Sequence, residues 1–307
     1  MAEYWDWFDC DSKSAQTRYV YGLRPDKDDI RNDRSALAKV AHCIHTHVKS
    51  SEIPIQLVKT CGSVGKNTDS SISSDLDLVI FIDELKPHEL ANKISGILDK
   101  IQDAMDEQYP GTRDEDWYRK FGLRYVIAGM EIDILIGCTT VKPKDFLTVD
   151  DANQRAYMSA SASRYATNFM KKQGRLFKDL VRVAKDWRDS FPGWPNQCKP
   201  KSYLLEVLML HSCRQARPRF FVKKHKKNTF KQSIRTTPNL VAFFMLQFFD
   251  MIGNIITIEP KVTRHATALV LDPANPTNNL WLTLADPTLF INRAKKTAEL
   301  LREEMEE

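Results

Sequence analysis

Two short apolar runs that each contain aspartate constrain this chain more than any other feature. Residues 75–82 read DLDLVIFI and residues 131–136 read EIDILI. Side chains alternate along a strand, so Asp75 and Asp77 project from the same face, about 7 Å apart. Asp133 is the best candidate for a third carboxylate, on a neighbouring strand of the same sheet. The pattern predicts a sheet that brings three acids together.

A glycine-containing segment, GSVGKNT at residues 62–68, precedes the first run. Gly62 and Ser63 predict a turn whose backbone N–H groups can approach a phosphate closely, because glycine has no Cβ. Lys66 and Thr68 add a cation and a hydroxyl. The spacing differs from that of the common P-loop, which has four residues between its first glycine and the Gly-Lys pair. An ATPase of that class is therefore disfavoured.

Together the turn and the acids predict a nucleotidyl-transfer site. Three carboxylates would hold two Mg²⁺ ions, or Mn²⁺ in their place. One ion would activate an attacking ribose hydroxyl, and the other would stabilise the leaving pyrophosphate.

The first half of the chain predicts a mixed-sheet lobe. Apolar residues recur at helical spacing over residues 28–50 and 87–109. Residues 53–60 predict a strand that leads into the Gly-Ser turn. Residues 123–136 predict a hairpin with its turn near Gly129.

Beyond about residue 155 the pattern changes to long helices. We expect an α+β protein with a catalytic lobe at residues 1–155 and a mostly helical lobe at residues 156–307. A helix over residues 174–190 would bury an apolar stripe and leave Lys178, Arg182 and Lys185 on its polar side. The apolar stretch at residues 240–249 is too short to span a bilayer and predicts a core helix.

Composition and cysteine usage favour an intracellular protein that does not bind membranes. The 307 residues are sufficient for a sizeable core. The six cysteines are scattered without paired spacing, and no apolar leader segment follows the start. Cys198 and Cys213 lie too far apart for a compact zinc site, so we expect no structural zinc. These features predict a cytoplasmic location.

Positive charge is concentrated in residues 211–235, which contain nine Lys or Arg residues and no acid, although the whole chain has a net charge of +5. Such asymmetry suits a polyanion, and RNA, DNA and anionic lipid are the candidates. No element suggests readout of base edges, which favours sequence-tolerant binding of double-stranded RNA. The expected RNA contacts are Arg31, Arg34, Lys39, Lys171, Lys172, Arg175, Lys223, Lys224, Lys226 and Lys227.

The spacing G-S-x-G-K-x-T followed by S-D-x-D resembles the 2′-5′-oligoadenylate synthetases and the cyclic GMP-AMP synthase-like receptors. GRLFKDLVRVAKDW at 174–187 and LVLDPANPTNN at 269–279 extend the resemblance. It implies a bilobal nucleotidyltransferase fold, with the helix over residues 28–50 as a spine that lies against RNA. It also implies that Lys185 contacts the donor triphosphate and that Tyr203 stacks on a base. Ser202 stands where many of these synthetases have glutamine.

The resemblance implies an innate antiviral enzyme that double-stranded RNA activates, by closing the lobes around the three acids. We expect it to be a monomer without RNA and to join ATP into 2′-5′-linked oligoadenylate, a second messenger. The alternative product is a cyclic dinucleotide made from ATP and GTP. Ser202 and the absence of arginines between Thr68 and Ser74 favour that alternative, whereas residues 269–279 favour oligoadenylate.

The sequence gives less support to two further classes of protein. The presence of all three acids argues against a non-catalytic RNA-binding module. A templated polymerase or a tRNA-tailing enzyme shares the Gly-Ser and Asp-x-Asp pattern, but nothing in the chain resembles an added tRNA-binding domain.

Overall fold

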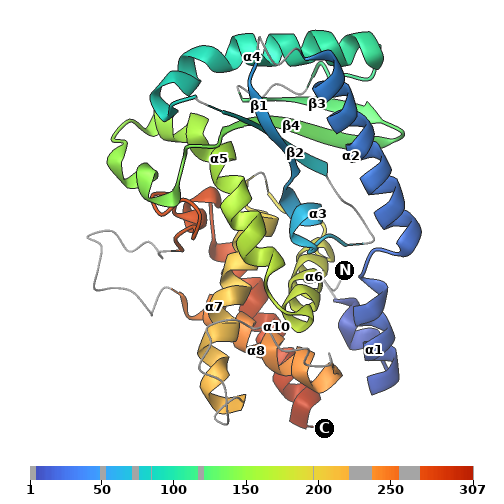
Figure 1. The fold of residues 1–307 in the computed structure, drawn as a ribbon. Coiled ribbons are helices and arrows are strands. Elements are labelled where there is room, and N and C mark those ends of the chain that lie inside the picture. Colours follow the sequence, from blue (N-terminus) through green and yellow to red (C-terminus); the bar gives the residue numbers. More distant parts are fainter. Residues whose placement is uncertain are drawn as a thin grey trace. The chain divides into compact units, whose positions relative to one another are not determined.

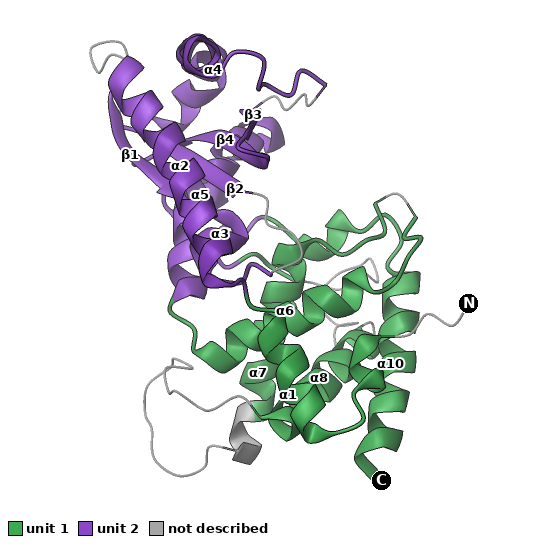
Figure 2. Ribbon diagram, turned by 90° about the vertical axis from the view of Figure 1, so that its right-hand side faces the viewer, with its two compact units in different colours: residues 1–24, 172–272, 278–307 green, residues 25–171, 273–277 purple. Residues whose placement is uncertain are grey.

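The computed structural model divides the chain into two compact units (Figure 2). One consists of residues 25–171 with 273–277, and the other of residues 1–24, 172–272 and 278–307. The structure describes residues 5–48, 53–70, 76–83, 85–116, 121–195, 197–220 without the side chains of 217–220, 237–255 and 270–306.

The first unit contains a four-stranded mixed sheet with strand order β1-β2-β4-β3 (Figure 1). Strands β2 and β4 are parallel, and the two outer pairs are antiparallel. The fold class predicted from the sequence is confirmed. The elements of this unit are α2 (Lys27–His47), β1 (Ile55–Thr60), α3 (Gly62–Lys66), β2 (Leu76–Ile82), α4 (Pro87–Gln108), β3 (Gly122–Ile127), β4 (Met130–Cys138), the 3₁₀ turn η2 (Pro143–Thr148) and α5 (Ala152–Lys171).

Helices pack against both faces of this sheet. Val79 and Phe81 form a buried cluster with Ala160 of α5 on one face. Tyr125 belongs to the opposite face, where its hydroxyl donates to Asp106 Oδ1 of α4 at 2.8 Å. Because side chains alternate along β2, Asp77 shares the face of Val79 and Phe81. The predicted acid therefore lies on the side of the sheet that α5 covers.

Local signals in the sequence account for the boundaries of these elements. Helix α2 begins with a capping box, in which Asp26 accepts hydrogen bonds from the backbone of Asp28 and Asp29 at 2.7 and 2.8 Å. The predicted hairpin is confirmed, because β3 and β4 are joined at Ala128 and Gly129, whose φ angles are 54° and 79°. Positive φ at both central residues is typical of a two-residue hairpin turn.

The second unit is helical and has an aromatic core. Trp187 packs on Phe249 with ring centroids 4.7 Å apart, and its indole N–H donates to Thr297 Oγ1 at 3.0 Å. The apolar stretch at residues 240–249 lies in a buried helix, as predicted. The elements of this unit are η1 (Asp6–Asp9), α1 (Lys13–Gly22), α6 (Arg175–Asp189), α7 (Ser202–Phe220), α8 (Pro238–Gly253), η3 (Leu280–Thr283) and α10 (Thr288–Glu306).

The N-terminal residues belong to the helical unit. The indole N–H of Trp5 donates to Asp186 Oδ2 at 3.2 Å, and that of Trp7 donates to Glu304 Oε2 at 3.1 Å. Tryptophan places a large apolar ring and one polar handle in the same contact. These two residues therefore anchor the start of the chain to α6 and α10.

The polar side of α6 is buried. Arg182 and Lys185, which were expected on this side of the helix, are only 7% and 5% exposed. Each has an acidic partner, because Arg182 Nη1 lies 3.2 Å from Asp179 Oδ1 and Lys185 Nζ lies 3.4 Å from Glu206 Oε1. Neighbouring helices cover this side of α6, and the ion pairs make the burial of its charges tolerable.

Among the helices that the structure describes, none is both long and apolar enough to cross a membrane.

Candidate active site

Two carboxylates face each other where the parallel strands β2 and β4 meet. Asp77 is paired with Asp133 in the strand register, so their backbones lie about 4.8 Å apart and their side chains share one face. Asp133 is only 4% exposed. Like charges directly opposite each other are destabilising, so this pair requires a cation nearby. Asp75, the third predicted acid, lies outside the described residues.

The glycine segment lies directly against Asp77. The predicted turn is a single helical turn, α3, and Gly62 begins it with φ of +56°. A Cβ at Gly62 would lie 1.8 Å from Asp77 Oδ2, which is far inside contact distance. The Cys61 N–H also donates to the Asp77 carbonyl at 2.8 Å. Glycine is therefore required here both for its backbone conformation and for the space that the carboxylate occupies.

Ser63 and Lys66 lie in the same short helix, and Thr68 follows it. Ser63 is half-buried, Lys66 is 8% exposed, and Thr68 is fully buried. Gly65 allows the helix to lie close to β1, since a Cβ there would be 2.5 Å from the Thr60 carbonyl oxygen. The structure thus places Gly62 against Asp77, with Ser63 and Lys66 in the same short helix.

Arg124 of β3 is a residue of this site that the sequence reasoning missed. Its Nε donates to Asp133 Oδ1 at 2.6 Å and its Nη2 donates to Asp133 Oδ2 at 3.2 Å. Its Nη1 donates to Glu131 Oε2 at 3.0 Å. The hairpin contained the signal, because a turn at 128 and 129 pairs Arg124 with Asp133 in the β3–β4 register. A bidentate guanidinium thus supplies positive charge at the acid pair.

The acids have the donor chemistry that a divalent cation requires. Carboxylate oxygens are preferred ligands of Mg²⁺, and a cation would relieve the repulsion between Asp77 and Asp133. Within the described part of the chain, no group of three or more His, Cys, Asp or Glu side chains is arranged to hold a metal ion. Asp77 and Asp133 thus supply oxygen ligands of the kind that fits such an ion, and Arg124 already donates to both oxygens of Asp133.

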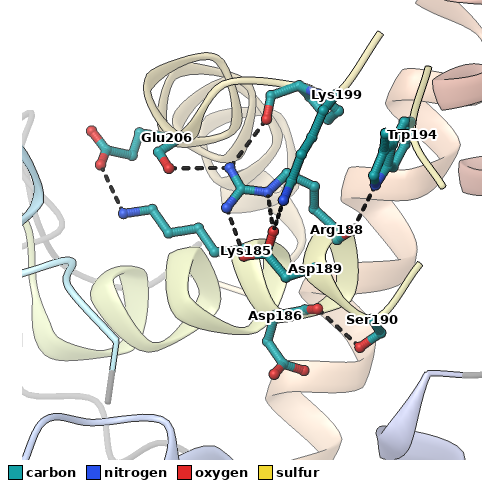
Figure 3. A network of polar contacts seen from close by, with 10 residues as sticks. Lys185, Asp186, Arg188, Asp189, Ser190, Trp194, Lys199 and Glu206 are labelled. Atoms are coloured by element: carbon teal, nitrogen blue, oxygen red, sulfur yellow. Dashed lines mark hydrogen bonds and ion pairs between the residues drawn. The ribbon is translucent and has the colours of Figure 1, made fainter. Parts of the chain in front are cut away.

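The remaining predicted nucleotide contacts lie in the helical unit, where α6 meets the start of α7 (Figure 3). Lys185 forms its ion pair with Glu206, and one turn further along α6, Arg188 Nη1 donates to Ser202 Oγ at 3.1 Å. Arg188 Nη1 also donates to the Pro200 carbonyl at 3.1 Å. Glu206 and Arg188 were missed from the sequence, because neither has a local signature. Their contacts hold Lys185 and Ser202 in defined positions.

Tyr203 is half-buried, and its hydroxyl donates to Asp272 Oδ1 at 2.7 Å. Burial, together with the Asp272 carboxylate, raises the pKa of the Tyr203 phenol above its ordinary value. The phenol therefore stays protonated and acts as a hydrogen-bond donor. The hydrogen bond to Asp272, which lies 69 residues further along the chain, holds the Tyr203 side chain in place.

The predicted RNA contacts that are described lie on the surface. Arg31, Arg34 and Lys39 are exposed on α2, and Arg31 pairs with Asp28 at 3.2 Å. The side chains of this pair are each 76% exposed, so solvent screens their attraction. Lys171, Lys172 and Arg175 are exposed between the end of α5 and the start of α6. Four further predicted contacts lie outside the described residues, namely Lys223, Lys224, Lys226 and Lys227.

Solved structures with a similar fold cover nearly the whole chain. CdnC from E. coli MS115-1 in complex with HORMA-deltaN is 15% identical, with 96% of this chain and 92% of that chain covered and a TM-score of 0.62. CdnC with ATP is also 15% identical, covering 93% and 90%, with a TM-score of 0.63. The poly(U) polymerase Cid1 bound to MgATP is 14% identical, covering 94% of each chain, with a TM-score of 0.61. At these identities the likeness shows the fold alone.

The family comparison covers the second half of the chain. Residues 145–304, more than half of the 307, match the model of 2′-5′-oligoadenylate synthetase 1, domain 2, C-terminus. The chain therefore belongs to the family of the 2′-5′-oligoadenylate synthetases, which are nucleotidyltransferases.

Proposed function

We propose that this nucleotidyltransferase joins ATP units into 2′-5′-linked oligoadenylate when double-stranded RNA is bound, as a second messenger of antiviral defence. The observation that carries the chemistry is the pairing of Asp77 with Asp133 on parallel strands, against the Gly62 backbone. The product assignment is supported by the match of residues 145–304 to the oligoadenylate synthetase model.

The acids and the cations would have separate tasks. Divalent ions held by Asp75, Asp77 and Asp133 would lower the pKa of the attacking ribose hydroxyl and neutralise charge on the departing pyrophosphate. Gly62 leaves room for the Asp77 carboxylate beside α3, and the backbone N–H groups of this segment would bind a phosphate. Lys66 and Lys185 would neutralise the donor triphosphate, a task suited to a compact ammonium group.

Base recognition is assigned to Tyr203. An aromatic ring stacks on any base, and such stacking is worth about 1 to 3 kcal/mol. The hydrogen bond to Asp272 fixes the orientation of the ring before substrate arrives. Ser202 precedes it at the start of α7, held by Arg188.

Activation by RNA is supported by the distribution of cations along the chain. Arg31, Arg34 and Lys39 lie along α2, and the segment 211–235 adds nine cations without an acid. Phosphate contacts of this kind are insensitive to sequence and weaken steeply with salt. Stimulation by duplex RNA should therefore depend on duplex length and fall as salt is raised.

A cyclic dinucleotide made from ATP and GTP is the second candidate product. It is favoured by the segment DSSIS at residues 69–73, which lacks the arginines of the vertebrate synthetases, and by Ser202 in place of glutamine. Both features concern how the acceptor nucleotide is held rather than how the bond forms.

One experiment distinguishes these products. The protein is incubated with radiolabelled ATP and GTP and Mg²⁺, with and without long duplex RNA, and the products are digested with linkage-specific nuclease and phosphatase. We expect 2′-5′-linked adenylate that requires RNA, whereas a phosphatase-resistant mixed product would establish the second candidate.

Variants of the acids test the site itself. Asp77→Asn and Asp133→Asn should abolish product. The matched control is Asp83→Asn, at the far end of β2, where Asp83 Oδ1 accepts from Thr139 Oγ1 at 2.9 Å. Full activity of either site variant, or equal loss in the control, would refute the assignment.

A further inference from the structure

Arg124 donates hydrogen bonds to both carboxylate oxygens of Asp133, an acid that is assigned to metal binding. Its Nε and Nη2 lie 2.6 and 3.2 Å from Asp133 Oδ1 and Oδ2. The side chains are 16% and 6% exposed, so little solvent screens the pair. A divalent cation at Asp133 would have to approach a carboxylate that already faces a fixed positive charge. Guanidinium and metal therefore compete for the same oxygens.

A second carboxylate gives the guanidinium an alternative partner. Glu131 precedes Asp133 by two residues on β4, so both side chains project from the same face. Arg124 Nη1 already donates to Glu131 Oε2 at 3.0 Å, and the Glu131 side chain is 53% exposed. Arg124 can leave Asp133 while this contact is kept, which lowers the cost of the movement.

The Arg124 side chain is 16% exposed, so it is not enclosed by close packing on every side. Arg124 is also one of the residues around a hollow of about 450 Å³ beside α4 and β3, together with Arg113, Asp114 and Tyr157.

We propose that Arg124 is an internal counter-ion that holds Asp133 before metal binds and transfers to Glu131 when the cation arrives. Arg124 is a positioning residue, because it acts through Asp133. The proposal rests on the proposed function only in assigning Asp77 and Asp133 to a divalent cation. It predicts opposite effects for the two residues: loss of Arg124, which pairs with Asp133, strengthens metal binding, and loss of Glu131, the second partner of Arg124, weakens it.

The test measures Mn²⁺ binding to the full chain without nucleotide, from the electron paramagnetic resonance signal of free Mn²⁺. Arg124→Gln should lower the Kd about tenfold, within the range over which neighbours of ligands tune metal affinity. Glu131→Gln should raise the Kd about threefold, as expected for a partly exposed charge. In the double variant the effect of Glu131→Gln should disappear, because Glu131 acts through Arg124.

A matched control separates this competition from a general change in charge. Arg113 lines the same hollow and pairs with Asp106 at 3.3 Å and with Glu115 at 3.2 Å. Arg113→Gln removes the same charge and should leave the Kd unchanged. If Arg124→Gln fails to fold, Arg124→Lys serves in its place, since lysine keeps the charge but loses the bidentate contact. It should give a smaller decrease in Kd.

Failure of this proposal differs from failure of the proposed function. An unchanged or higher Kd in Arg124→Gln, with Mn²⁺ binding lost in Asp77→Asn, would overturn the role of Arg124 alone. Mn²⁺ binding that persists unchanged in both Asp77→Asn and Asp133→Asn would refute the metal site itself, and both proposals with it.

Discussion

Replacing Gly62 by alanine tests whether the glycine segment and Asp77 form a single unit. The added Cβ would lie 1.8 Å from Asp77 Oδ2 and 2.7 Å from its Cγ. Ordinary contacts begin at about 3.4 Å, so the carboxylate must move by about 1.6 Å. The variant also places alanine at φ of +56°, a conformation that L-residues adopt at a cost.

The two effects have different magnitudes and different readouts. The left-handed backbone should lower the free energy of unfolding by about 1 to 2 kcal/mol. A displacement of about 1 Å at a reacting centre reduces activity about a hundredfold, so Gly62→Ala should lose at least that much. Most of the functional loss thus comes from the moved carboxylate rather than from instability.

Gly111 provides the matched control, because its φ is +70° and a Cβ there would meet nothing within 4 Å. Gly111→Ala should show the same loss of stability with unchanged activity. Stability is measured by urea unfolding, and activity by pyrophosphate release from ATP. Full activity in Gly62→Ala, or an equal loss of activity in Gly111→Ala, would show that Gly62 and Asp77 do not form a single unit.

Three further predictions concern the rest of the structure. Tyr203→Ala should lower kcat/KM tenfold to a hundredfold, because base stacking is lost. Tyr203→Phe loses only the hydrogen bond to Asp272, so its kcat/KM should fall less. An equal fall of kcat/KM in the two variants, measured by steady-state kinetics, would contradict this. Arg24 forms a bidentate pair with the fully buried Asp179 at 2.9 and 2.6 Å, and Arg182 stays beside Asp179 at 3.2 Å when Arg24 is removed. Arg24→Ala should therefore cost about 1.5 to 3 kcal/mol in urea unfolding, and a cost below about 1 kcal/mol would refute the role of the pair. Burial raises the pKa of the Tyr125 phenol in the folded state. As pH rises above about 10, this phenol should therefore ionise first in the unfolded state, and the free energy of unfolding should fall. Tyr125→Phe should make that fall less steep, and an unchanged dependence of the free energy of unfolding on pH would contradict the prediction.

Local patterns in the sequence were sufficient to predict several elements. Helix α4 and the hairpin between β3 and β4 lie within a residue or two of their expected positions. The expected neighbour of Asp77 is also where it was predicted, since Asp133 lies on β4 beside β2. Arg124 was within reach of the same reasoning, because a two-residue turn fixes which residues pair across a hairpin.

Long-range partners could not be obtained in this way. Lys185 was placed on a polar side of its helix, and it is buried against Glu206. Tyr203 was assigned to stacking without any indication that Asp272 holds its hydroxyl. Neither partner follows from periodicity, because an amphipathic pattern shows which side of a helix is apolar but not which neighbour covers the other side.

The sequence by itself determined the strand and helix periods, the glycine turn and the acids, because each depends on residues that are close neighbours in the chain. Tertiary structure alone decided the register that places Asp77 opposite Asp133 and the burial of the α6 charges. The physical reason is that a parallel strand pair and a helix interface join distant segments, whose alignment depends on packing across the whole unit.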